Sequence, residues 1–168
     1  MNKSVKDRLL IYLSLLIALI IDSYNFSNIF QFIKPSFVLL VLIYWNMALP
    51  DRVGITTALL FGVLVDLLQS SILGLHGLLF VLITYLCQRF FYQFRITPIW
   101  QQSFLIFILM ILFKQILAFD FLDSSVNRTN LSDGSYLINT FYYAILSSIS
   151  WPFVYYLCRL YRRRWIKI

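Results

Sequence analysis

Long runs of apolar residues cover most of this chain, and short polar or proline-containing segments separate them. A helix of about 20 apolar residues is long enough to cross a bilayer, so the runs predict transmembrane helices. We place six of them, at residues 9–33, 36–49, 53–72, 75–94, 99–119 and 136–160. The expected fold is all-α, with residues 1–168 forming a single polytopic transmembrane domain.

The ends of the first two predicted spans rest on weaker signals. Residues 24–33 mix aromatic side chains with Asn25, Ser27 and Asn28, so they fit either the end of the first span or the outer membrane interface. The second span follows Pro35, which suits the first turn of a helix, and it ends before Pro50, which does not continue one easily.

The third and fourth predicted spans are joined only by a short uncharged turn at Gly74. Such a turn makes its two helices antiparallel neighbours, and we expect this hairpin to form the rigid centre of the molecule. One face of the third span would carry small side chains and one acid at every fourth position, namely Gly54, Ala58, Gly62, Asp66 and Ser70. Small residues permit close helix contact, which we place within this chain, although the same face fits the transmembrane helix of another protein.

Composition supports a membrane protein, because 61% of the residues are hydrophobic and only 12% are charged, against about 25% charged in soluble domains. The net charge of +7 does not indicate nucleic-acid binding, since the charges lie between the apolar runs. With the N-terminus in the cytoplasm, Lys34 and Arg128 fall outside, Lys114 falls within a span, and the remaining eleven of fourteen basic residues fall inside. The inside set is Lys3, Lys6, Arg8, Arg52, Arg89, Arg95, Arg159, Arg162, Arg163, Arg164 and Lys167. Both termini are therefore expected in the cytoplasm.

The basic C-terminal segment has two interpretations. Arg159, Arg162, Arg163, Arg164 and Lys167 fit a cytoplasmic anchor on anionic lipid, at about 1 kcal/mol per basic residue near the surface. The same residues would also suit a docking site for a protein partner. We favour the anchor, and the two interpretations are compatible.

Two ionisable residues fall inside predicted spans, and both lie roughly 20 Å from the inner surface. Asp66 and Lys114 are therefore predicted to form an ion pair, because an unpaired charge at that depth is costly. The alternative is a Lys114 side chain that extends outward beside a protonated Asp66. His76 is the single histidine, and we expect it to make a hydrogen bond that fixes the turn.

Catalytic chemistry is not indicated. One histidine is too few for a metal site, and Cys87 and Cys158 are expected near the opposite surface from His76, as reduced and apolar residues. The chain contains no glutamate. We expect no catalytic, cofactor or metal site, and favour a binding or scaffold protein over an enzyme.

Three segments, KPSFVLLVLIYW, LPDRVG and GVLVDLLQSSILGLHGL, resemble the MreD family of bacterial rod shape-determining membrane proteins. The resemblance extends over the chain in length and span pattern, and its specific part is the stretch from Lys34 to Leu78. Ser70 departs from the family pattern, which has glycine there, but it is also a small residue and leaves close helix contact feasible. The matching positions are Pro35, Pro50, Arg52, Val53, Gly54, Asp66, Leu68, Leu73 and Gly74.

The resemblance implies a non-catalytic part of the cell-elongation machinery in the bacterial inner membrane. Its implied partners are a bitopic, coiled-coil MreC-type protein and, indirectly, the actin-like MreB filament and the transpeptidase and glycosyltransferase of lateral peptidoglycan synthesis. The family also implies a six-helix arrangement similar to the substrate-binding subunit of energy-coupling-factor vitamin transporters. The alternative function is a small-molecule binding subunit of such a transporter, with an outward-opening polar pocket formed by Asp66, His76, Lys114 and the loop after the fifth span.

Overall fold

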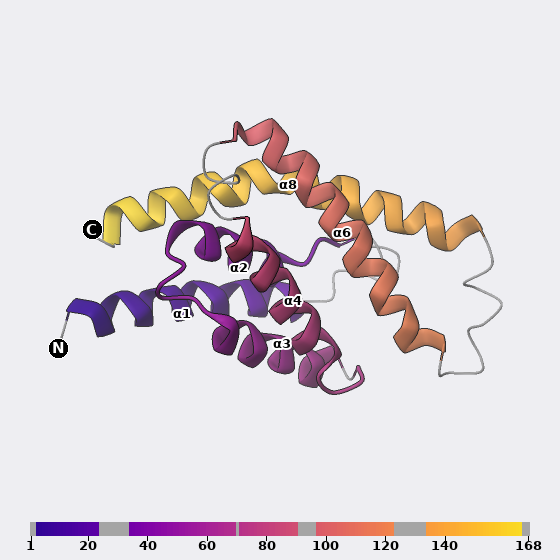
Figure 1. The fold of residues 1–168 in the computed structure, drawn as a ribbon, viewed down its shortest axis with the longest axis horizontal. Helices are drawn as coiled ribbons and strands as arrows, with labels where there is room; N and C mark the ends of the chain where they lie inside the picture. Colours follow the sequence, from indigo (N-terminus) through magenta and orange to yellow (C-terminus); the bar gives the residue numbers. More distant parts are fainter. Residues whose placement is uncertain (1–2, 24–33, 70, 91–96, 123–133, 166–168) are drawn as a thin grey trace.

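The computed structural model describes residues 3–23, 34–69, 71–90, 97–122 and 134–165. These residues form an all-α protein with six helices, as the apolar runs predicted (Figure 1). The helices are α1 (Lys3–Ser23), α2 (Phe37–Ala48), α3 (Ile55–Gln69), α4 (Leu75–Arg89), α6 (Ile99–Leu122) and α8 (Gly134–Trp165).

The helix bounds differ from the predicted spans mainly in the first and last helices. α1 begins at Lys3, before the apolar run, while the uncertain segment 24–33 lies outside the described residues. α8 extends through the arginine cluster to Trp165. Among the described residues, one stretch, Ile99–Leu117, is long and apolar enough by itself to cross a membrane, and α2, α3 and α4 are shorter apolar helices.

The centre of the bundle is α2, whose residues from Val38 to Met47 are all buried. A helix that is apolar on every side is stable only when other helices surround it, and α2 packs against α1, α4 and α8. The α3–α4 hairpin was expected at the centre, but both of its helices expose an outer face that includes Leu60 and Leu78. That placement was wrong, because a short turn makes two helices neighbours but does not surround them with other helices.

Buried polar side chains connect α2 to its neighbours. Trp45 Nε1 donates to Ser14 Oγ of α1 at 2.9 Å, and Asn46 Nδ2 donates to Thr84 Oγ1 of α4 at 3.1 Å. Gln88 Nε2 of α4 then donates to Asn46 Oδ1 at 3.3 Å. These bonds fix how α2 is rotated between α1 and α4.

The outer faces of α1, α3, α4, α6 and α8 are apolar and exposed. Ile20 on α1 is 67% exposed, Trp100 on α6 is 71% exposed, and Phe153 on α8 is 65% exposed. So much apolar surface on one small protein is typical of contact with lipid or with other membrane helices.

The start of α1 and the end of α8 lie on the same side of the bundle (Figure 1). Tyr161, near the end of α8, donates its hydroxyl to the carbonyl of Leu10 in α1 at 3.2 Å. At the same end, Arg52 in the α2–α3 turn forms an ion pair with the buried Asp7 of α1. The opposite end carries the turn between α3 and α4.

Candidate functional site

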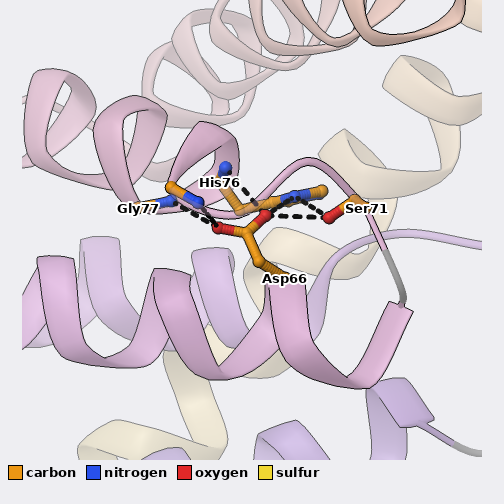
Figure 2. Close-up of polar contacts among 5 residues, drawn as sticks. Asp66, Ser71, His76 and Gly77 are labelled. Carbon is orange, nitrogen blue, oxygen red and sulfur yellow. Dashed lines mark hydrogen bonds and ion pairs between the residues drawn. The ribbon is translucent and has the colours of Figure 1, made fainter.

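The candidate site is the buried carboxylate of Asp66 on α3, which lies against the start of α4 and is 1% exposed (Figure 2). Its Oδ1 atom accepts hydrogen bonds from Ser71 Oγ at 2.8 Å, His76 Nδ1 at 2.7 Å and the His76 backbone nitrogen at 3.1 Å. Its Oδ2 atom accepts from the backbone nitrogens of Gly74 at 2.8 Å and Gly77 at 3.4 Å. Both carboxylate oxygens therefore accept hydrogen bonds from the segment between α3 and α4 and from the first turn of α4.

The Asp66 carboxylate replaces a missing helix cap. The first amides of a helix have no partner within the helix, and a side chain at the cap position usually accepts from them. The cap position of α4 is Gly74, which has no side chain and has φ +97°. Asp66 supplies the acceptor from α3, and its negative charge lies at the positive end of the α4 dipole.

His76 extends this cluster toward α6. The sequence predicted a hydrogen bond from His76 at this turn, and the structure places that bond on Asp66. The imidazole ring meets the ring of Phe113 on α6 edge-on, with 5.9 Å between centroids, and the ring of Phe80 at 6.4 Å. The site therefore connects α3, α4 and α6.

Lys114 does not join the site, so the predicted ion pair with Asp66 was wrong. Its Nζ atom lies 5.0 Å from the ring centroid of Tyr143 on α8, which is a cation–π contact. The carboxylate of Asp66 pairs with His76 instead. Equal depth in the membrane placed the two charges at one level, but depth does not determine which side of a helix each one faces.

Not all of the small residues predicted for the face of the third span take part in its contact with α4. A Cβ atom added to Gly62 would overlap Gly77 Cα and would lie 2.6 Å from Gly77 N, so the backbones of α3 and α4 touch there. Ala58, one turn earlier, is fully buried. Gly54 precedes α3, and a Cβ atom added to it would have nothing within 4 Å, so Gly54 takes no part in this contact, contrary to the predicted pattern. Ser70 lies outside the described residues.

A second carboxylate, Asp22, does for α2 what Asp66 does for α4, and sequence reasoning missed it. Its Oδ1 atom accepts from the backbone nitrogen of Phe37 at 3.0 Å, and its Oδ2 atom accepts from that of Val38 at 3.0 Å. Lys34 Nζ donates to the Asp22 carbonyl at 2.9 Å. The sequence features that could have indicated this role are an acid at the end of one apolar run, Asp22, and a proline just before the next run, Pro35.

Comparison with known proteins identifies the family. The family profile described as rod shape-determining protein MreD matches residues 3–161. A rod shape-determining protein MreD of Haemophilus influenzae is 30% identical over 135 residues, which cover 80% of this chain and 79% of the relative. The chain belongs to the MreD family. The resemblance seen in the three sequence segments is thereby confirmed, and no solved structure matches the chain.

The other predicted positions of this MreD family member lie at the opposite end of the bundle or outside the described residues. Arg159, Arg163 and Arg164 of α8 are exposed and Arg162 is half-buried, whereas Lys167 lies outside the described residues. Cys87 and Cys158 are free and buried, apart from each other on α4 and α8. In the described part of the chain, no group of three or more His, Cys, Asp or Glu side chains is placed to hold a metal.

Proposed function

We propose that this MreD-family protein is a non-catalytic scaffold of the cell-elongation machinery in the bacterial inner membrane. It binds a bitopic MreC-type protein and helps couple an MreB-type cytoskeleton to the transpeptidase and glycosyltransferase of lateral wall synthesis. Family membership supports the role in rod shape. The partners follow from the family resemblance.

The observation that carries the scaffold role is the use of the Asp66 carboxylate. All of its donors, from Ser71, Gly74, His76 and Gly77, belong to the same hairpin. A carboxylate so engaged is a structural cap, and releasing it for acid–base chemistry would expose unpaired amides in an apolar surrounding. The arrangement favours a rigid hairpin that presents fixed helix faces to a partner.

In this proposal the six helices are six spans, with both chain ends in the cytoplasm. The end that carries Asp7, Arg52 and Tyr161 faces the cytoplasm, because it also carries the exposed arginines of α8. The helices α2, α3 and α4 are each shorter than a standard span, and α2 is shielded from lipid by its neighbours.

The contact between Gly62 and Gly77 excludes one surface of α3 as the binding surface for a partner helix. Because Gly62 lies directly on Gly77, a partner helix has no access to that surface. The exposed outer sides of the helices, such as the side of α3 with Leu60 and Leu67, remain as docking surfaces for a transmembrane helix.

The test combines depletion in a rod-shaped host with copurification from mild detergent. Depletion should produce round, swelling cells, and the wild-type chain should copurify with the bitopic partner. Expression of the Gly54→Ala variant in the depleted cells should restore the rod shape, because its added methyl group has no other atom within 4 Å. Rod-shaped cells after full depletion, or a folded protein that never retains the bitopic partner, would overturn the proposal. A vitamin requirement in normal rods would instead support the transporter function.

A further inference from the structure

Lys114 on α6 is a cation inside a predicted span, and no acid described by the structure forms an ion pair with it. The ion pairs among the described residues join Asp7 to Arg52 and Asp66 to His76. The contact of Lys114 Nζ is the ring of Tyr143, which attracts a cation but does not neutralise it. A charge within the bilayer is costly unless it is paired, so Lys114 indicates a missing anion.

The acids that the structure describes do not supply this anion. Asp22 and Asp66 each accept hydrogen bonds from backbone amides at the start of a helix. Asp7 pairs with Arg52, and Asp51 is exposed in the turn beside Arg52, at the other end of the bundle. A second copy of this part of the chain would bring the same acids in the same positions. The anion therefore comes from a different molecule.

The ammonium group of Lys114 can be reached from outside the bundle. Lys114 is only half-buried. In the described part of the chain, the Tyr44 hydroxyl is the one enclosed side-chain polar atom without a hydrogen-bond partner. Since Lys114 Nζ has no hydrogen-bond acceptor among these residues either, it is not fully enclosed and keeps contact with the surface. Two turns earlier on the same face of α6, Phe107 meets the ring of Phe141 of α8, which is 52% exposed.

From this combination we propose that the exposed edge of the α6–α8 contact binds the transmembrane helix of a partner protein that carries one carboxylate at the depth of Lys114. The carboxylate pairs with the Lys114 ammonium group, and apolar side chains of the partner helix pack against Phe107 and Phe141. The inference rests on the proposed scaffold function, which requires a bitopic partner. It adds the edge at which that partner binds and the group that its helix carries.

A carboxylate on a helix fits this position better than the phosphate of an outer-leaflet lipid. Lys114 lies eight residues before the end of α6 at Leu122, about 12 Å along the helix axis. Tyr143 lies nine residues after the start of α8 at Gly134, about 13 Å along its axis. A lysine directed to a headgroup would extend toward these helix ends, whereas Lys114 is held over the ring of Tyr143. At that depth a helix can place an acid among the acyl chains.

The test measures association between the full-length protein and a synthetic peptide in phosphatidylcholine vesicles, by energy transfer between two fluorescent labels. The probe is a leucine-rich transmembrane peptide of about 20 residues with one aspartate placed about 8 Å inside one end of its apolar segment. One control peptide has asparagine at that position, and another has the aspartate moved out to its polar end. The wild type should bind the probe about tenfold more tightly than either control peptide.

Variants of the protein assign this preference to Lys114. Lys114→Gln should abolish the preference for the aspartate peptide, and Lys114→Arg should retain it, because arginine keeps the positive charge. The matched control is Gln115→Leu, which changes an uncharged half-buried neighbour and should alter binding less than about twofold. The comparison of the three peptides on the wild type needs no variant, so it decides the question even where Lys114→Gln fails to fold.

Two outcomes would overturn the inference directly: equal binding of the aspartate and asparagine peptides by the wild type, or an aspartate preference that persists in a folded Lys114→Gln variant. Binding of phosphatidylglycerol that depends on Lys114 in native mass spectrometry, without peptide binding that depends on it, would assign the residue to a lipid and would also overturn it. Copurification separates this inference from the scaffold function. A bitopic partner retained equally by the wild type and Lys114→Gln would overturn the inference alone, whereas a wild type that never retains the partner would overturn the scaffold function.

Discussion

The carboxylate of Asp66 caps a helix to which it does not belong, with its Oδ2 atom 2.8 Å from the backbone nitrogen of Gly74. Asp22 makes the equivalent contact from α1 to the first turn of α2. In lipid, unpaired amides at a helix start cost several kcal/mol each, because no water is present to bond them. The first turns of α2 and α4 are thus each capped by an acid from the preceding helix, which makes these helix starts compatible with an apolar environment.

Replacement of Asp66 should destabilise the hairpin. Asp66→Asn keeps one acceptor oxygen but loses the charge at the α4 dipole, and Asp66→Ala leaves the amides of Gly74 and His76 without acceptors. We expect the free energy of unfolding in mild detergent to fall by about 1–3 kcal/mol for the Asn variant and by more for the Ala variant. Asp51→Asn, at an exposed turn acid, is the control and should be close to neutral. Equal effects at the two positions would contradict the capping role.

Gly62 and Gly54 form a matched pair for testing helix contact. Gly62→Ala forces the backbones of α3 and α4 apart, because the added methyl group overlaps Gly77. We expect a loss of about 1–3 kcal/mol in unfolding free energy. Gly54→Ala meets open space, and we expect a change within about 0.5 kcal/mol. A larger loss at Gly54 would mean that the spacing of small residues, and not the local contact, determines the cost.

The sequence was sufficient for the six helices and for the close pairing of α3 with α4. Apolar runs and their breaks at Pro35, Pro50 and Gly74 predicted six helices, and an acid deep in an apolar run with a histidine beyond the turn directed attention to Asp66 and His76. These features can be recognised locally, because they depend on the thickness of the bilayer, on residues that end helices and on the cost of a buried charge.

The errors concern how the helices are rotated about their axes. Asp66 and Lys114 lie at similar depth, yet Lys114 faces Tyr143 of α8. In the sequence Asp22 is only an acid at the end of an apolar run, because its role depends on the chain returning beside it at Phe37. The rotation of each helix about its axis, and which later segment packs beside it, depend on contacts between residues far apart in the chain, which a single sequence does not reveal.

The separation of Lys114 from the site predicts independent effects. In a double-mutant cycle, Asp66→Asn and Lys114→Gln should add to within about 0.5 kcal/mol of unfolding free energy, since the two side chains share no partner. Lys114→Gln and Tyr143→Leu should instead couple, because the second change removes the aromatic ring under the ammonium group. Coupling in the first cycle and additivity in the second would mean that Lys114 interacts with Asp66 and not with Tyr143.

The ion pair at the other end of the bundle should couple α1 to the α2–α3 turn. The Asp7 side chain is 7% exposed and that of Arg52 is 27% exposed, so water screens the pair only partly. We expect Asp7→Asn and Arg52→Gln to show a coupling energy of about 0.5–3 kcal/mol in a double-mutant cycle. Arg8→Gln, at an exposed neighbour of Asp7, is the control and should be additive with Arg52→Gln.

The two turns of the α2–α3–α4 segment should open to opposite sides of the membrane. Asp51 is exposed in the turn beside Arg52, and Leu73 is 66% exposed in the turn capped by Asp66. In a background with Cys87 and Cys158 replaced by alanine, a membrane-impermeant thiol reagent should label Leu73→Cys in right-side-out vesicles and Asp51→Cys in inverted vesicles. In the proposed topology Asp51 lies on the cytoplasmic side, because its neighbour Arg52 pairs with Asp7 at the end of the bundle that carries the exposed arginines of α8. Labelling of both positions from one side would mean that α3 does not cross the bilayer, and the reverse pattern would place both chain ends outside.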